Sequence, residues 1–322
     1  MCTQNQLSPF AFVEVEIGGG NGNLVETLES LMPSSAQMLN ILRIKTLKLF
    51  KGVNSFRFYS YEPLACTIQR SIDASSRDWS DTSRPLFLVC LISTEYSMEG
   101  ESPYTYRMMY SRETPDPSDE LLATEFAKLI GTSNASGEMV FATVDMRYRP
   151  FLCKIATKFG KTMDSMGTRT WALYLPKAKA DGWKREIKYG RAGKDITVKP
   201  LSSGDATTVN SHWKWGTLES DPHIRDQIEK LPSAGVFSND DLVSWGILCL
   251  TGTISALQTQ ESHRRRGFGE LIMKSISTQM IEHEMVPFCE VELDTTASRK
   301  MMDKLGFIVA FDAAWMSWPH NN

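Results

Sequence analysis

The sequence predicts an α/β protein whose mixed, twisted sheet has helices on both faces. Strand-length runs alternate between apolar and polar residues at 10–17 and 253–260, and mainly apolar runs occur at 86–93 and 242–250. Helical patterns separate many of these runs. The clearest one spans residues 267–284, where Phe268, Ile272 and Ile276 recur on one face with a period near 3.6 residues. Interleaved strands and helices are typical of a sheet that helices cover.

The N-terminal half has a mixed pattern that ends in a predicted linker. Strands are expected at residues 10–17, 86–93, 104–110, 139–145 and 171–175, and helices at 24–32, 38–49, 119–129 and 150–159. The polar, lysine-rich segment 177–194 is typical of a connection between domains. With 322 residues, the chain is long enough for two domains that each bury a core. We therefore expect an N-terminal α/β domain at 1–194 and a second domain at 195–322.

The C-terminal half repeats part of this pattern. Strands are expected at 196–201, 234–237, 242–250, 253–260, 288–293 and 308–318, and helices from about 203 and at 221–231, 267–284 and 295–304. Gly306 follows the last helix, where a left-handed cap prefers glycine. Residues 141–160 and 288–306 share a strand, a turn, a helix and a terminal glycine, and a strand with tryptophan follows each. We interpret this as a tandem duplication, although a generic β-α-β layout would also produce it.

Composition excludes several classes of function. The chain is 42% hydrophobic and 23% charged with a formal net charge of −3, whereas general nucleic-acid binding requires a strongly basic domain. Its longest apolar runs have strand length, so no membrane span is expected.

Six scattered cysteines without a C-x-x-C pair predict neither a metal site nor disulfides. No secretory signal is expected, and four glutamates precede the first basic residue, Arg43, which argues against a mitochondrial presequence. We expect a cytoplasmic protein.

Three arginines and two glycines mark the turn between the strand 253–260 and the helix 267–284. The segment 263–276 reads HRRRGFGELIMKSI, in which Arg264, Gly267 and Gly269 form R-x-x-G-x-G. Glycines let the backbone approach a ligand closely. The following helix directs its unpaired N–H groups and positive dipole end into the turn, which suits a pyrophosphate. The arginines add long-range attraction. The turn therefore predicts a binding site for acyl-coenzyme A.

Other interpretations of the glycines remain open. A tight connection and a solvated basic turn would have the same sequence. A dinucleotide site requires G-x-G-x-x-G, but Ile272 occupies the third glycine position. The run at 18–23 fails the same test because Asn23 replaces the third glycine, so a flexible connector explains it.

The order of elements from 253 to 307 resembles the GNAT superfamily of acyl-CoA-dependent N-acyltransferases, and the chain is most similar to its glycine N-acyltransferase family. The residues that carry this resemblance are Val209-Asn210, Trp213, Val243-Ser244-Trp245, Thr251-Gly252, Arg264, Gly267, Val291, Ala297, Lys300-Met301 and Leu305. A weaker similarity at 104–112 extends into the N-terminal half. The resemblance implies a GNAT-like fold built from two tandem halves, of which the N-terminal one is degenerate.

The same resemblance implies where acyl-CoA would bind. The strand around 257–260 would run beside the pantetheine arm, the turn at 264–269 would hold the pyrophosphate, and the thioester would meet an amine between the strands 253–260 and 288–293. The implied cofactor-binding residues are Leu257, Gln258, Thr259, Arg264, Arg265, Arg266, Gly267, Phe268, Gly269 and Glu270. No metal takes part. Direct attack of a neutral amine on the thioester needs positioning, an oxyanion donor and a route for the proton.

Three positions depart from the family pattern. Thr253 occupies the position of the glutamate that serves as general base in many members, Thr295 replaces an asparagine, and Met302 replaces the tyrosine that often acts as general acid. General acid–base help is worth about 10²–10⁴ in rate, so the absence of the usual proton-handling groups need not abolish catalysis. Thr253 remains a catalytic candidate because its hydroxyl can hold a water molecule.

Other side chains are possible substitutes for the missing groups. Glu290 and Glu292 lie two residues apart, so they project to one face of their strand, where Glu292 is the second catalytic candidate. Solvated carboxylates at a sheet edge are the favoured interpretation of both. Histidine is a common proton carrier, but His263 lies at the turn and is expected to contact phosphate or solvent. The remaining aromatic candidates would wall an acyl or acceptor pocket or fill the core: Trp213, Trp215, Trp315 and Trp318.

Three functional hypotheses follow. The first is an acyl-CoA-dependent N-acyltransferase whose partners are acyl-CoA and a small amine or amino acid, with glycine-like acceptors implied by the resemblance. The second is a CoA-binding pseudoenzyme that acts as a sensor or scaffold, which the departures at Thr253 and Met302 favour. A protein acetyltransferase is a weaker third. Family resemblance alone adds mitochondria as an alternative location.

Overall fold

The computed structural model describes residues 10–17, 22–48, 54–63, 71–94, 105–131, 139–165, 169–180, 182–183, 190–193, 195–215 and 220–318. The strands are β1 (Phe10–Glu16), β2 (Asn54–Pro63), β3 (Ser71–Asp73), β4 (Phe87–Thr94), β5 (Thr105–Ser111), β6 (Met139–Asp145), β7 (Asp164–Ser165), β8 (Thr170–Tyr174), β9 (Gly190–Gly193), β10 (Ile196–Lys199), β11 (Ser233–Ser238), β12 (Asp241–Leu248), β13 (Ile254–Thr259), β14 (Phe288–Glu292) and β15 (Ile308–Trp318). The helices are α1 (Leu24–Ser30), α2 (Ala36–Thr46), α3 (Glu120–Gly131), α4 (Arg149–Lys158), α5 (Lys177–Ala180), α6 (Ala206–His212), α7 (Asp221–Lys230), α8 (Phe268–Glu282) and α9 (Thr296–Leu305).

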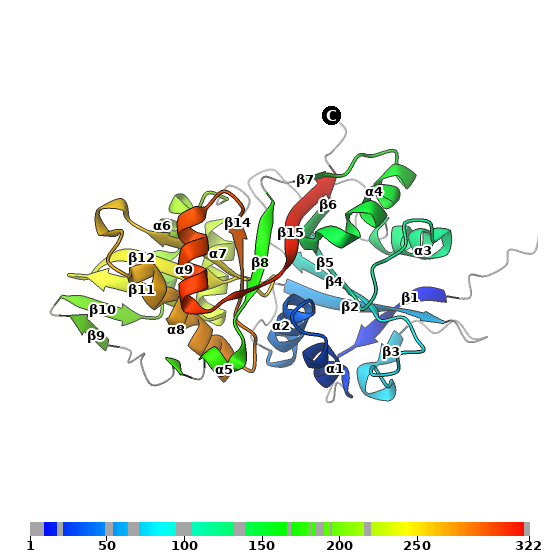
Figure 1. Ribbon diagram of the computed structural model, residues 1–322, viewed down its shortest axis with the longest axis horizontal. Coiled ribbons are helices and arrows are strands. Elements are labelled where there is room, and N and C mark those ends of the chain that lie inside the picture. Colours follow the sequence, from blue (N-terminus) through cyan, green and yellow to red (C-terminus); the bar gives the residue numbers. More distant parts are fainter. Residues whose placement is uncertain are drawn as a thin grey trace, which may run out of the picture.

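The strands of the described residues form one continuous mixed sheet that crosses the whole molecule (Figure 1). Its order is β3-β1-β2-β4-β5-β6-β15-β8-β14-β13-β12-β11-β10-β9, with the short β7 beside β15. Strands β1 to β6 of the N-terminal half form one end of the sheet, and strands β10 to β13 of the C-terminal half, joined by β9, form the other. The predicted mixed sheet is therefore confirmed.

The two halves exchange their last strands at the centre of the sheet. β8, from the N-terminal half, pairs antiparallel with β14, while β15, the last strand of the chain, pairs antiparallel with β6. β8 and β15 also pair with each other. The units β6-α4-β8 and β14-α9-β15 match in order, and Gly160 (φ +65) and Gly306 (φ +84) follow both helices in the left-handed conformation. The tandem arrangement predicted from the repeat is confirmed.

Helices cover both faces of the sheet. Side chains from α1, α2 and α8 share one hydrophobic core that runs through both halves, whereas α3 and α4 cover the opposite face of the N-terminal half. In the C-terminal half, α6 and α7 cover that opposite face and enclose the fully buried Trp245. A core shared between α2 and α8 means that the halves fold against each other along the length of the sheet.

Most predicted elements lie within a few residues of the observed ones, and two regions need correction. The 10-residue strand β2 was not predicted, although Phe56 and Phe58 are buried there between β1 and β4. The predicted linker 177–194 contains α5 and β9, because Ala180 and Trp183 are buried and β9 pairs with β10. The proposed domain boundary at residue 194 lies outside the described residues, as does the glycine run at 18–21.

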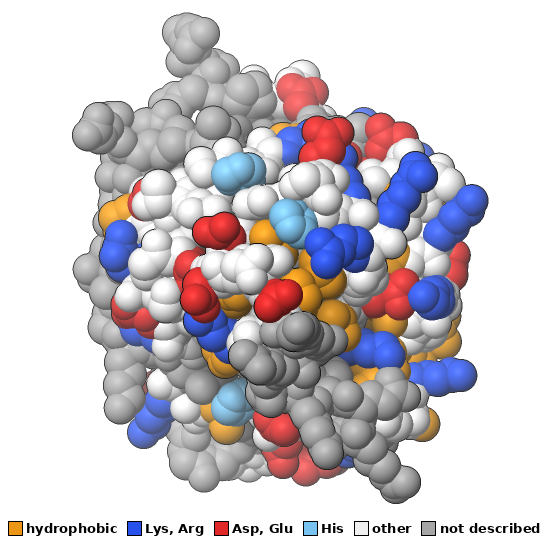
Figure 2. Space-filling view, turned by 90° about the vertical axis from the view of Figure 1, so that its left-hand side faces the viewer, with side chains coloured by type: hydrophobic (Ala, Val, Ile, Leu, Met, Phe, Trp, Pro, Cys, Tyr) orange, Lys and Arg blue, Asp and Glu red, His pale blue; other side chains and the backbone are white. Residues whose placement is uncertain are grey.

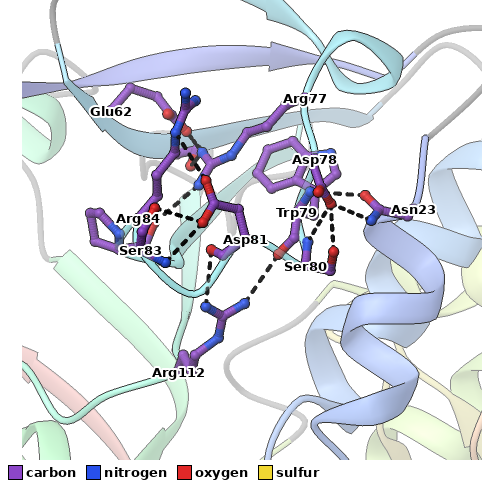
Figure 3. A network of polar contacts seen from close by, with 12 residues as sticks. Asn23, Glu62, Arg77, Asp78, Trp79, Ser80, Asp81, Ser83, Arg84 and Arg112 are labelled. Carbon is purple, nitrogen blue, oxygen red and sulfur yellow. Dashed lines mark hydrogen bonds and ion pairs between the residues drawn. The ribbon is translucent and has the colours of Figure 1, made fainter.

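A polar network fixes the segment before β4 in the N-terminal half (Figure 3). Arg77 is ion-paired with Glu62, donates to Ser60 Oγ at 2.8 Å, and lies 4.3 Å from the ring centroid of Trp79. Burial lowers the pKa of Arg77 to about 10, so the guanidinium remains charged at neutral pH. Asn23, just before α1, accepts from Trp79 N at 2.8 Å. These contacts tie α1 to the sheet beneath it.

Candidate active site

The strands β13 and β14 diverge in the middle of the C-terminal half. They are parallel neighbours, but the only paired residues between the two strands, as described, are Ile254 and Cys289. At Ala256 the backbone turns to φ +51, and the register of β13 against β12 shifts at the same place. The irregularity bends β13 away from β14. Beyond Ile254, the edge of β13 that faces β14 has no described strand partner, so its N–H and C=O groups are available to a ligand.

A cleft of about 460 Å³ fills the gap between the diverging strands. Its walls combine apolar and aromatic side chains with two carboxylates. The described lining residues are Tyr106, Val140, Thr170, His212, Trp213, Lys214, Trp215, Ile254, Ser255, Ala256, Leu257, Gln258, Met273, Cys289, Glu290, Val291, Glu292, Thr295, Ser298, Met302 and Trp315. Because Tyr106, Val140 and Thr170 come from the N-terminal half, both halves build the cleft.

The R-x-x-G-x-G turn lies beside the mouth of this cleft. A shallow hollow next to it is lined by Gln260, Glu261, Ser262 and Arg264, and it shares His212 and Gln258 with the cleft. Gly267 is the N-cap of α8 and has φ +79, a conformation that strongly favours glycine. A Cβ at Gly269 would lie 3.2 Å from Met301 Sδ, so that position packs tightly against α9. The 15-residue helix α8 begins at this turn, so its first amides have no partners within the helix.

Only some of the side chains around the turn face solvent. Arg264, Arg265 and Arg266 are exposed, although Arg264 Nε donates to Thr259 O at 3.3 Å and Arg266 lies over the ring of Phe268. The side chain of Phe268 is buried, so only the backbone N–H of this residue could donate to a bound anion. Figure 2 shows this end of the molecule, where lysine and arginine side chains gather mainly on the right-hand side beside exposed hydrophobic ones.

The remaining predicted cofactor residues divide into two groups. Leu257 and Gln258 line the cleft, whereas Thr259 Oγ1 is hydrogen-bonded to Ser244 Oγ at 2.8 Å. Glu270 is ion-paired with Lys304 at 2.6 Å, so its contribution to an anion site would also come from its main chain. The structure places the predicted strand in the cleft and the predicted turn beside the cleft's mouth, and their contact with acyl-CoA stays a prediction.

The two carboxylates of β14 do not lie at a sheet edge, and that part of the expectation was wrong. β14 lies inside the sheet between β13 and β8. Glu290 accepts hydrogen bonds from Thr143 Oγ1, Thr170 Oγ1 and Trp315 Nε1 at 2.7, 2.7 and 3.0 Å. Glu292 is ion-paired with Lys214 at 2.8 Å. The alternation of the strand was predicted correctly, but its position in the sheet depends on the strand exchange, which the sequence pattern does not encode.

The three positions that depart from the resembled family's pattern differ in their access to the cleft, which Thr295 lines. Thr253 is 2% exposed and does not line the cleft; its Oγ1 lies 3.0 Å from Thr251 Oγ1 and 3.2 Å from Ser255 Oγ, and Ser255 does line it. Met302, 3% exposed, does line the cleft beside Cys289, whose thiol has a pKa raised by burial. A thiol of this kind is mostly protonated at neutral pH, which argues against a nucleophilic role.

Aromatic side chains line the cleft, in agreement with the first of the two interpretations of these tryptophans, a pocket lining as opposed to core packing. Trp213, Trp215 and Trp315 all line it, while Trp213 also packs against the core beneath α6. The side chain of Trp318 lies outside the described part of the chain. His263 is hydrogen-bonded to Ser262 and stacks on Phe268 away from the cleft. The sequence missed Tyr106 and Ser298; the similarity at 104–112 was the only signal for the first.

A stoichiometry of one acyl-CoA per chain is expected. In the N-terminal half, α3 connects the parallel strands β5 and β6 as α8 connects β13 and β14. Asp119 caps α3 by accepting from Leu122 N at 2.9 Å, and neighbouring acidic residues would repel a pyrophosphate. No R-x-x-G-x-G precedes α3. Calorimetric titration with acetyl-CoA should give one site, and two sites would contradict this prediction.

The structure holds no described cluster of residues suited to a metal ion, and no helix in the described residues is long and apolar enough to cross a membrane. Among the cysteines in the described part, Cys90, Cys153, Cys249 and Cys289 form no disulfide.

Comparisons with known proteins bear on the fold and on the C-terminal half. The family model described as FR47-like protein matches residues 233–316, which contain the diverging strands and the turn. No curated protein matches the chain. The solved structure of a Drosophila protein is 14% identical, covers 98% of this chain and 100% of its own, and has a TM-score of 0.68.

Two further solved structures are similar over most of the chain. A tandem GNAT protein from the clavulanic acid biosynthesis pathway is 12% identical, with 97% of this chain and 98% of that chain covered and a TM-score of 0.49. A putative acetyltransferase from Pyrococcus horikoshii is 8% identical, with coverages of 100% and 93% and a TM-score of 0.47. From its own strand order, its matching halves and the FR47-like segment, the chain has a GNAT-like α/β fold in two tandem halves.

Proposed function

We propose that this protein is an acyl-CoA-dependent N-acyltransferase that acylates a small amine or amino acid. The supporting observation is the cleft between β13 and β14, which opens beside the N-terminus of α8. An acyl-CoA molecule placed there would have the unpaired edge of β13 beside its pantetheine arm and the N-terminus of α8 near its pyrophosphate. Glycine-like acceptors are favoured by the sequence resemblance alone.

The described residues suggest where each part of acyl-CoA would lie along the cleft. The pyrophosphate would accept hydrogen bonds from the first amides of α8 around Gly267, and the pantetheine amides would pair with the exposed edge of β13. The acyl group would contact the apolar side chains of Ile254, Met273 and Met302. A backbone N–H on the same edge of β13 would donate to the oxyanion that forms when the amine attacks. Holding both reactants in this geometry supplies most of the required catalysis.

The second candidate is a CoA-binding protein without turnover. The observation that favours it is the chemistry at two positions: Thr253 is buried away from the cleft, and Met302 offers no proton inside it. The turn at Gly267 supports cofactor binding under both proposals, so it does not distinguish them.

A two-stage assay tests the proposed function. Thermal shifts with a panel of acyl-CoAs would first identify the preferred acyl chain, and release of the CoA thiol would then be followed against a library of amines and amino acids. The enzyme hypothesis predicts amine-dependent thiol release. Stabilisation by acyl-CoA without thiol release for any acceptor would favour the binding protein, and no stabilisation would contradict both.

Thr253→Val is expected to slow acyl transfer about fivefold with little effect on acyl-CoA binding. The change removes the hydroxyl that bridges Thr251 and Ser255, and a lost buried hydrogen bond costs about 1 kcal/mol. Steady-state kinetics and calorimetry would measure the two effects, with Ser255→Ala as the companion variant. A loss above about 10² in rate would instead mean that the Thr253 hydroxyl itself handles the proton.

Thr253→Glu separates the two candidate functions. It restores the carboxylate that many members of the resembled family carry at this position. If the wild-type protein releases no thiol and this variant does, the protein is a CoA binder that lost its base.

A further inference from the structure

We infer that the acceptor is a primary amine with an aromatic or apolar body and no carboxylate, and that Glu290 binds its ammonium group and takes up its proton. This inference rests on the proposed acyl transfer and names the acceptor class for the same cleft. It differs from the glycine-like acceptor that the sequence resemblance favours.

Glu290 is held by side chains from three strands besides its own. Thr143 on β6 and Trp315 on β15 donate to Oε1 at 2.7 and 3.0 Å, and Thr170 on β8 donates to Oε2 at 2.7 Å. β8 lies next to β14, and β15 and β6 follow it in the sheet, because the two halves exchange β8 and β15 (Figure 1). The exchange therefore builds a fixed position for one carboxylate inside the cleft.

The backbone at Thr143 indicates that this arrangement is maintained against strain. Thr143 has φ +51, which is rare for a β-branched residue, and the register of β15 against β6 shifts close by. The internal repeat aligns Thr143 with Glu290, so equivalent positions of the two halves meet in one hydrogen bond. Strained residues of this kind cluster at functional sites.

The contacts of Glu290 leave room for an ammonium group. A carboxylate has about four lone-pair sites, and the three donors leave Oε2 with one more. All three donors are neutral, and no lysine or arginine of the described residues is ion-paired with Glu290. The negative charge inside the cleft is therefore uncompensated, which favours a cationic ligand.

The other charged groups of the cleft disfavour an acceptor that has its own carboxylate. Glu292 is neutralised by Lys214, whose Nζ lies 2.8 and 2.9 Å from the two carboxylate oxygens. Among the described lining residues, His212 is the remaining basic side chain, and it also borders the outer hollow. The carboxylate of an amino acid would therefore lie near Glu290 without a spare cation to bind it.

Aromatic side chains surround the position that the amine would occupy. Trp315 donates to Glu290 and has Tyr106 packed edge-on against it, with centroids 6.1 Å apart at 85°. Trp213 and Trp215 line the cleft as well. Indole faces attract ammonium groups and pack well against rings and alkyl chains. The walls thus suit the body of an arylalkylamine better than the hydrogen atom that glycine carries as its side chain.

The proton balance of the reaction requires two acceptors. The bound ammonium gives one proton to the Glu290 carboxylate, and the neutral nitrogen then attacks the thioester carbonyl carbon. The new C–N bond forms, the C–S bond breaks, and the nitrogen loses its second proton to the departing thiolate. The products are the amide and the CoA thiol, and Glu290 returns its proton to solvent.

Paired acceptors test the inference. Thiol release from acetyl-CoA would be compared for 2-phenylethylamine and L-phenylalanine, which share a ring and an amine and differ in the carboxylate. The wild-type protein is expected to prefer the amine at least tenfold in kcat/KM. Glu290→Gln, which keeps the shape of the side chain, should lower kcat/KM for the amine at least tenfold while acetyl-CoA affinity stays within twofold. Glu229→Gln, an exposed change on α7, serves as the charge-matched control.

Calorimetric binding of 2-phenylethylamine to the CoA-loaded protein gives a readout that does not need turnover. Binding that Glu290→Gln weakens supports the inference even if no thiol is released, in which case only the proposed acyl transfer fails. A preference for phenylalanine or glycine, or amine binding that Glu290→Gln leaves unchanged, would overturn the inference and leave the proposed transfer standing. Thr143→Val should weaken amine binding less than Glu290→Gln does, as expected for a positioning residue.

Discussion

Replacing Gly267 with valine is expected to weaken acetyl-CoA binding 10- to 100-fold. Gly267 has φ +79 at the N-cap of α8, where a β-branched residue is strained by about 1–3 kcal/mol. A Cβ at this position would meet no atom within 4 Å, so the fold has room for the change. The loss comes from reorientation of the amides at the start of α8 and from a side chain over the anion site.

Gly267→Asn is the matched control for this prediction. Asparagine tolerates the left-handed conformation better than valine, so this variant keeps the turn while it adds a side chain. A smaller loss for asparagine would assign the effect to backbone conformation, and equal losses would assign it to blocked approach. Calorimetry would measure the acetyl-CoA affinity of both variants, and circular dichroism would show that they are folded. Wild-type affinity in a folded Gly267→Val variant would contradict the proposed site. Binding should also weaken as salt increases.

The second large effect is expected at the contact between the two halves, where Asn40→Leu should destabilise the protein by about 3 kcal/mol. Asn40 is 0% exposed on α2, and its Nδ2 donates to Gly252 O at 2.9 Å and Val286 O at 2.8 Å. Its Oδ1 accepts from Val286 N at 2.8 Å. Leucine would leave one buried backbone group and two partly buried ones without a partner, and each costs about 1 kcal/mol.

The same change should reach the cleft, because Gly252 and Val286 lie just before β13 and β14. Helix α2 thereby holds the starts of the two strands whose divergence forms the cleft. We expect a weaker acyl-CoA affinity in Asn40→Leu even where the protein remains folded. Gln37→Leu, which removes one bond from α2 to Thr251 O, is the graded control and should cost about a third as much. Urea unfolding would measure both changes in stability, and a change below about 1 kcal/mol for Asn40→Leu would contradict this role of Asn40.

The sequence determined the local parts of this protein. The 3.6-residue period of α8, the glycine at its N-cap and the left-handed Gly306 after α9 are set by residues close together in the chain, so pattern and backbone preference suffice to predict them. The repeat of residues 141–160 and 288–306 predicted the tandem arrangement in the same way, by comparing two local patterns.

Only the tertiary structure decided how these parts form one site. The exchange of β8 and β15 placed Glu290 among Thr143, Thr170 and Trp315, whereas the sequence favoured a solvated edge for the same carboxylate. Asn40 and Gly252 lie 212 residues apart, and Thr143 and Glu290 lie 147 apart. Hydrogen bonds over such separations depend on which strands become neighbours. Periodicity predicts which face of a strand is apolar, but it carries no information about the strand that will lie beside it.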